Sequence, residues 1–139
     1  MSWKELLTRE VEGTYKVTED LVAMVDDKDL DWKPSTGSNW MTTGQLLMHI
    51  GTSVCGSAFK GFATGDWGLP EGMDISEMSE EDMMPPAEKM PAVPNVAEAK
   101  RLLAADKKTA LDTLASLSEE DLATRPAPAP WDQSKMILG

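Results

Sequence analysis

The 139-residue chain carries 24 acidic and 13 basic side chains, which gives a formal net charge of −11. This charge disfavours binding to nucleic acid or to an anionic membrane surface, because both attract clustered lysines and arginines. No apolar run approaches the roughly 20 residues needed to cross a bilayer. The single cysteine, Cys55, can form no intrachain disulfide, and no signal-peptide pattern opens the chain. We therefore expect one soluble, cytoplasmic domain over residues 1–139.

The first predicted helix covers about residues 3–26. Ser2 and Glu5 have the spacing of a capping box, in which each side chain accepts a hydrogen bond from the other residue's backbone N–H. Apolar residues recur at helical spacing along this stretch at Leu7, Val11, Leu21 and Val25. This spacing predicts a face packed on other helices, and the acidic run at 26–29 is expected to end the helix.

A second helix is predicted to begin at Thr42, where Thr42 and Gln45 repeat the capping-box spacing, and to continue toward Phe62. Its intrinsic propensity is low, because each glycine in a helix interior costs about 1 kcal/mol relative to alanine. The glycines in this stretch are Gly44, Gly51, Gly56 and Gly61. Such a helix needs support from its neighbours, so we expect it to be central and buried.

Residues 64–94 lose the helical periodicity, and several prolines exclude a long helix there. A short acidic helical turn is expected around residues 76–83. The methionines of this loop suit either a cover over apolar surface or a solvated connector. The third long helix is the clearest, because Asn95 is a good N-cap and leucines recur at helical spacing as far as Leu117. A short turn at 118–122 and an extended proline-rich segment follow it.

The second half of the chain echoes the first. Each half has an acidic turn, a leucine, a basic residue before a proline, and then a tryptophan: Asp26 to Pro34 with Trp40, and Ser118 to Pro126 with Trp131. When Trp40 is aligned with Trp131, the counterpart of His49 falls just beyond Gly139. We therefore expect the C-terminal helix to be missing or truncated. The apolar faces left exposed would then favour a homodimer or a domain-swapped oligomer.

The run Trp40-Met41-Thr42-Thr43-Gly44-Gln45-Leu46-Leu47-Met48-His49-Ile50, preceded by Trp32-Lys33-Pro34, resembles the DinB-like superfamily of damage-inducible and related metal-binding proteins. The resemblance implies an all-α, up-down-down-up four-helix bundle, frequently dimeric, with a divalent metal held by three histidines. One of these histidines lies on the second helix in a Leu-Leu-x-His context, which His49 matches. The other two form a His-x-x-x-His pair on the last helix, and His49 is the only histidine in this sequence. The resemblance therefore predicts the fold more fully than the activity.

His49 is the candidate metal ligand. Imidazole suits zinc or nickel, and an open coordination position can activate water or a thiol. Because catalytic zinc sites use three protein ligands, the alternative is a partly buried, hydrogen-bonded histidine without metal. The candidate pocket-lining residues are Trp40, Gln45, Ser53 and Trp67. For the two tryptophans, the alternative is a role in the core or in anchoring a loop.

Other groups have weaker claims to a site. Asp66 and the acidic cluster at 80–82 suit a metal or a general base, but such residues more commonly form a solvated face. Cys55 lies about 240° around a regular helix from His49, so the two are not expected to share a metal. A small, buried apolar residue is its expected role.

Two functional hypotheses follow from these residues. The leading one is a DinB-like protein that binds a divalent metal, zinc or nickel, and acts as a metal-dependent hydrolase or thiol transferase. The competing one is a non-catalytic helical module that binds a small apolar ligand or a protein partner through the bundle end and the methionine-rich loop. Stoichiometric metal that is lost on His49→Ala would favour the first hypothesis, and metal-free protein with unchanged folding would favour the second.

Overall fold

A computed structural model describes residues 1–73, 77–79, 82, 85–127 and 137–138. The helices are α1 (Trp3–Val22), α2 (Thr43–His49), the π-helical segment η2 (Ile50–Val54), α3 (Gly56–Thr64), α5 (Val96–Ser116) and α6 (Glu119–Thr124), with 3-10 turns η1 (Asp27–Asp29) and η4 (Ala87–Lys89). The all-α prediction is confirmed: the described residues contain no strand beyond an isolated bridge between Pro126 and Ile137. None of the described helices is long and apolar enough to cross a membrane.

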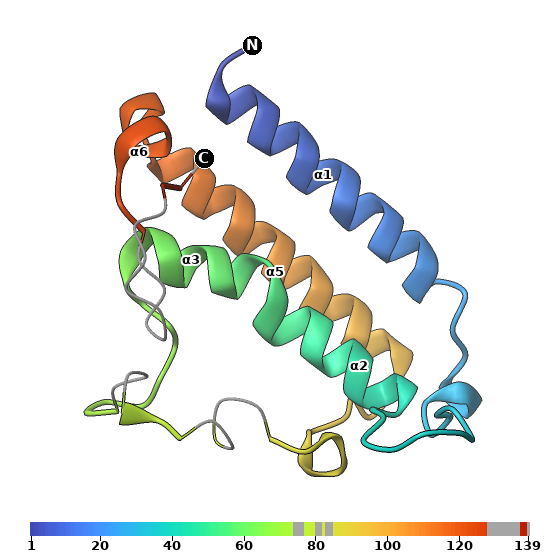
Figure 1. Ribbon diagram of the computed structural model, residues 1–139. Coiled ribbons are helices and arrows are strands. Elements are labelled where there is room, and N and C mark those ends of the chain that lie inside the picture. Colours follow the sequence, from blue (N-terminus) through green and yellow to red (C-terminus); the bar gives the residue numbers. More distant parts are fainter. Residues whose placement is uncertain (74–76, 80–81, 83–84, 128–136, 139) are drawn as a thin grey trace.

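The three main helical runs follow an up-down-down order (Figure 1). Helix α1 runs in one direction, and both the α2–α3 run and α5 return in the other. Because α2–α3 and α5 are parallel, the chain between residues 65 and 95 has to travel back along the bundle before α5 begins. This order is the one expected for the first three helices of the predicted bundle. The expected acidic turn at 76–83 and the expected start of a fourth helix fall largely outside the described residues.

Helix α1 begins as predicted and ends earlier than predicted. Ser2 Oγ accepts from the backbone N–H of Glu5, and the Glu5 carboxylate accepts from the N–H of Ser2, which completes the capping box. The helix stops at Val22 rather than near residue 26. Directly after it, the N–H groups of Met24 and Val25 donate to the carbonyl oxygens of Leu21 and Val22, three residues back, and the chain then enters the η1 turn, where the N–H of Asp26 donates to the Asp29 carboxylate at 3.4 Å.

The second predicted helix starts with the expected capping box of Thr42 and Gln45, but it is not one regular helix. It divides into α2, the π segment η2 and α3. At the division, the backbone of Gly56 lies against α5 so closely that an added Cβ would come within 2.1 Å of the Asp106 carbonyl oxygen. Only glycine fits this contact. Gly56 weakens the second helix, and the close packing of its backbone against that of α5 offsets this loss of stability.

A buried carboxylate holds this division in place. The Asp106 side chain of α5 accepts from the Tyr15 hydroxyl at 2.6 Å, from the N–H groups of Gly56 and Ser57 at 2.9 Å, and from the Ser57 hydroxyl at 2.9 Å. Its charge lies at the N-terminus of α3, where the helix dipole favours an anion. Burial raises the pKa of Tyr15 far above its ordinary value, and the hydrogen bond to Asp106 raises it further. Asp106 thus joins α1, α3 and α5.

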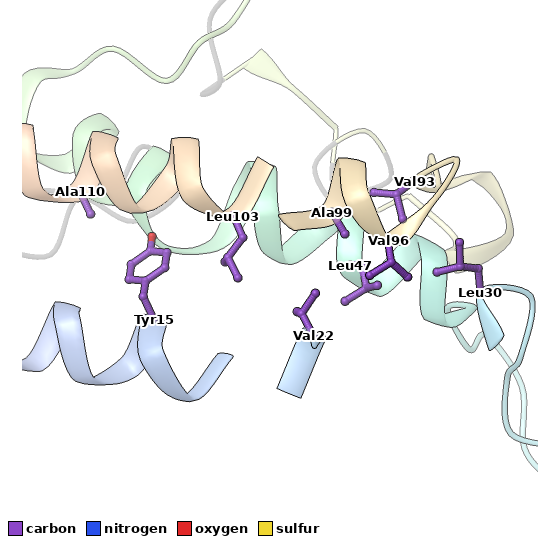
Figure 2. Close-up of a cluster of buried hydrophobic side chains, with 9 residues drawn as sticks. All are labelled: Tyr15, Val22, Leu30, Leu47, Val93, Val96, Ala99, Leu103 and Ala110. Carbon is purple, nitrogen blue, oxygen red and sulfur yellow. The ribbon is translucent and has the colours of Figure 1, made fainter. Parts of the chain in front are cut away.

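Helix α5, rather than the second helix, is the central element. It packs against both α1 and α3, and it contributes to both clusters of buried apolar side chains. The larger cluster contains Tyr15, Val22, Leu30, Leu47, Val93, Val96, Ala99, Leu103 and Ala110 (Figure 2). The smaller contains Ala63, Leu114, Leu117 and Leu122. Helix α2 buries only one side, since Leu46 remains 46% exposed.

The segment expected to be a turn at 118–122 forms the short helix α6. Ser118 and Asp121 make a capping box there, and Leu122 is fully buried. The Glu119 carboxylate also accepts from the N–H groups of Trp3 and Lys4, so α6 caps the start of α1. In both halves of the sequence echo, an acidic turn therefore precedes a buried leucine, Leu30 or Leu122. The counterpart tryptophan, Trp131, lies outside the described residues.

We expect Asp106→Asn to lower the free energy of unfolding by about 3 kcal/mol, because its amide NH2 would face donors that now meet a carboxylate. Tyr15→Phe removes one of the four donors and should cost about 1 kcal/mol. Urea unfolding followed by circular dichroism measures both. The control is Asp112→Asn, an exposed aspartate on the same helix, which should cost less than about 0.5 kcal/mol. Equal losses at Asp106 and Asp112 would contradict the proposed role of the buried carboxylate.

Candidate functional site

Large apolar side chains remain exposed along one strip of α1 and just beyond its end. Its members are Leu6, Val17 and Leu21 on the helix and Met24 after it. Each lies one residue before a position that is buried or partly buried, at residues 7, 18, 22 and 25. One residue corresponds to about 100° around an α-helix, so the exposed strip runs alongside the buried one. Its apolar members lie toward the two ends of α1, and the exposed residues Glu10, Gly13 and Thr14 occupy its middle.

On helix α2, too, an exposed apolar residue comes one position before a buried one. Leu46 is exposed and precedes the buried Leu47, and His49 follows Leu46 by three residues on the same side of the helix. Because α1 and α2 run in opposite directions and both pack on α5, equal offsets place both exposed strips on the same side of α5. We call this surface the open face, and it comprises Leu6, Val17, Leu21, Met24, Leu46 and His49.

His49 lies at the last position of α2, directly before the π segment. The residue is partly buried, as expected, but its Nδ1 atom is buried and has no hydrogen-bond partner among the described residues. Buried polar atoms are nearly always paired in folded proteins. An unpaired imidazole nitrogen is a position at which a ligand donor or a metal ion would satisfy the structure.

The described residues do not by themselves fit a tight metal site. No three histidine, cysteine, aspartate or glutamate side chains come together among them in a way that could hold an ion. A catalytic zinc ion takes three protein ligands, and the described part of the chain offers His49 alone on the open face. The described residues therefore support no catalytic step through a metal.

The side chain of Gln45 serves the fold. It is buried, its Oε1 accepts from the N–H of Thr42, and its Nε2 donates to the carbonyl oxygens of Ala87 and Met90 at 2.7 and 2.8 Å. These bonds hold the loop before α5 against the start of α2. Ser53 is exposed on η2, with its hydroxyl 3.2 Å from that of Thr52, and a pocket-lining role for it stays a prediction.

The two candidate tryptophans lie at opposite ends of the α2–α3 run. Trp40 precedes α2, is half exposed and donates from Nε1 to the Thr36 carbonyl oxygen at 2.7 Å. Trp67 follows α3, meets Phe62 edge-on at 4.9 Å and lies over Gly61, where an added Cβ would come within 2.4 Å of its ring. These contacts correspond to loop anchoring. The structure therefore does not bring the two tryptophans together around His49.

Two other candidates lie at the surface. The Asp66 carboxylate is 2.6 Å from Lys60 Nζ, and this contact, with the N–H of Gly68, lowers the pKa of Asp66. Asp66 and Lys60 thus form an exposed ion pair, which corresponds to the solvated acidic face rather than to a metal site. Cys55 is exposed between η2 and α3, so the expectation of a buried cysteine is wrong. The residue lies at the break in the second helix, outside both helical segments.

The raised pKa of Cys55 makes a testable prediction. Although the residue as a whole is exposed, its thiol is partly shielded from water, which raises its pKa, and the nearby Asp106 carboxylate raises it further. Because the thiolate is the reactive form, alkylation by iodoacetamide near neutral pH should be slower in the folded chain than in urea. The rate should also begin to rise at a higher pH in the folded chain. Faster alkylation of the folded chain would indicate an activated thiol and contradict this prediction.

The chain was compared with known protein families, curated proteins and solved structures. The family model described as the DinB superfamily matches residues 10–139. No curated protein and no solved structure matches the chain significantly. The match covers nearly the whole sequence, and the up-down-down order of the helices suits the bundle that the resemblance implied. The chain belongs to the DinB superfamily.

Proposed function

We propose that the chain acts as a helical binding domain and that the open face is its binding surface. The observation that carries this proposal is the group of exposed apolar side chains on one side of the bundle: Val17 and Leu21 are 61% and 60% exposed, and Leu46 is 46% exposed. Scattered apolar residues are common on protein surfaces, but apolar residues grouped on one face mark interaction sites. A small apolar ligand or an apolar protein segment is the class of partner that such a face accepts.

His49 would give this surface its polar specificity. Binding sites are mostly apolar and use a few polar groups to orient the ligand. The buried Nδ1 of His49 lacks a partner among the described residues, so a ligand that hydrogen-bonds to it would satisfy a group that otherwise costs about 1–3 kcal/mol. We therefore expect ligands with one polar group on an apolar body to bind more tightly than purely apolar ones.

A divalent metal at His49 is the second proposal, and the same unpaired Nδ1 favours it. Zinc or nickel accepts imidazole nitrogen, and such an ion could polarise a substrate carbonyl or a bound thiol. A hydrolase or thiol transferase would use that chemistry. His49 alone cannot hold the ion tightly, so further ligands would have to come from outside the described residues or from the substrate.

The binding proposal predicts saturable binding of a fluorescent apolar probe, anilinonaphthalene sulfonate, to dilute, natively folded chain. Leu21→Lys and Leu46→Lys should each weaken binding several-fold, because each places a charge on the open face at a cost of about 1 kcal/mol or more. Met73→Lys is the matched control, since Met73 is 51% exposed in the loop after α3. Apolar probes also bind to partly folded chains with loosened packing. Cooperative thermal unfolding of each variant would show that such chains are not the source of the probe fluorescence. Equal effects at all three positions would contradict the proposal.

The metal proposal predicts that zinc or nickel stays with the chain through exhaustive dialysis and that His49→Gln abolishes this retention. Elemental analysis gives the metal content, and calorimetric titration gives the affinity. Thr52→Ala, an exposed change near His49, should leave both values unchanged. Metal-free wild-type chain, or full retention by His49→Gln, would remove metal binding at His49 from consideration and leave the binding-domain proposal intact.

A further inference from the structure

We infer that the π segment η2 is a one-residue insertion in the α2–α3 run, and that it places Val54 beside Leu46 and His49 of the open face. This inference rests on the proposed function, because it adds a contact residue to the same binding surface and specifies the class of ligand. The spacing of buried residues along the run differs from that of one regular helix, and the difference amounts to one residue.

A regular helix would bury Val54 and turn Gly56 away from α5. Leu47 is 7% exposed and belongs to the larger buried cluster. At about 100° per residue, a side chain seven positions later returns to within about 20° of the same side, whereas one nine positions later lies about 180° away. The structure has the reverse arrangement: Val54 is 46% exposed, and the backbone of Gly56 lies against Asp106 of α5. The run therefore contains one residue more than a regular helix would need between Leu47 and Gly56.

Contacts at both ends of the run hold the extra residue in place. At the start of α2, the Gln45 side chain bonds to the loop before α5. At the start of α3, the N–H groups of Gly56 and Ser57 donate to the Asp106 carboxylate at 2.9 Å. Because neither end can rotate without breaking these bonds, the extra residue is accommodated between them, in the wider turn of η2.

The insertion transfers Val54 to the side of Leu46. One extra residue delays the rotation of the side chains that follow it by about 100°. Val54 thereby takes the position that lies seven residues after Leu46 in a regular helix, and both side chains are 46% exposed. His49 follows Leu46 by three positions on this same side. The three residues form one stripe, in which the imidazole lies between two apolar side chains.

The order of this stripe specifies the ligand. Seven helical positions span about 10 Å along the helix axis, and His49 lies between Leu46 and Val54 within that span. A ligand that hydrogen-bonds to His49 Nδ1 and covers both apolar residues needs its polar group in the middle and an apolar group on each side. A molecule with its polar group at one end would leave one of the two apolar residues uncovered. The ligand class is therefore an apolar molecule with a central hydrogen-bonding group.

Deletion of Thr52, an exposed residue of η2, tests the insertion. The shortened run should form a regular helix that keeps the contacts at both ends and turns Val54 toward α5. Cooperative urea unfolding should therefore be retained, and binding of anilinonaphthalene sulfonate should weaken several-fold. Thr52→Ala is the matched control, because it keeps the number of residues and should bind the probe as the wild-type chain does. Loss of cooperative unfolding on deletion, or unchanged probe binding, would overturn the insertion.

Val54→Lys tests the contact without changing the length of the run. Because Val54 is 46% exposed, the unfolding midpoint should change little, whereas probe binding should weaken several-fold, as for Leu46→Lys. Met73→Lys, at a similarly exposed position in the loop after α3, is again the control. Probe binding that is unaffected by Val54→Lys would remove Val54 from the binding surface.

Two isomeric amides test the ligand class. N-butylpentanamide carries its amide between two butyl groups, and nonanamide carries the amide at one end of a single alkyl chain. N-butylpentanamide should displace the probe from the wild-type chain at a several-fold lower concentration, and Val54→Lys should abolish this preference. Equal displacement by the two isomers would overturn the central position of the polar group.

The lysine changes on the established part of the open face separate this inference from the proposed function. If Leu21→Lys and Leu46→Lys weaken probe binding but neither Val54→Lys nor the deletion in η2 does, the inference fails and the binding surface stands. If none of these changes weakens binding, both fail.

Discussion

The Asp106 carboxylate is the contact on which the arrangement of the helices depends. It lies on the central helix α5 and accepts hydrogen bonds from Tyr15 of α1 and from the first residues of α3. A buried charge is tolerated only when it is fully hydrogen-bonded, so these donors have to stay in place. Apolar packing would allow the three helices to slide or rotate relative to one another, whereas this network specifies one alignment.

That alignment also explains the irregular second helix. For Gly56 and Ser57 to direct their N–H groups at Asp106, the regular hydrogen bonding of α2 has to be interrupted, and the π segment η2 provides the interruption. Such π segments occur frequently at functional sites. Here the π segment begins immediately after His49, so the position of the imidazole on the open face depends on the same network that stabilises the core.

The open face follows from the central position of α5. Helices α1 and α2–α3 both direct their most apolar sides at α5, and the neighbouring apolar strips are left on a common side. His49 lies among these strips with an unpaired nitrogen, so the surface offers both apolar area and one polar contact. The ligand-binding and metal-binding proposals both use this one surface, and each has a measurement that can reject it separately.

The sequence by itself determined the helical class and the starts of the three long helices at Ser2, Thr42 and Asn95, because capping and apolar spacing are local properties. His49 was singled out as a candidate ligand by the resemblance to the family. Only the tertiary structure decided that α5 is central, that the second helix divides at Gly56, that Gln45 holds a loop and that Cys55 is exposed. Asp106 and Tyr15 gave no local signal, since residues 91 positions apart become partners only when the helices pack. The glycines of the second helix showed that support was needed, and the structure showed that a buried carboxylate supplies it.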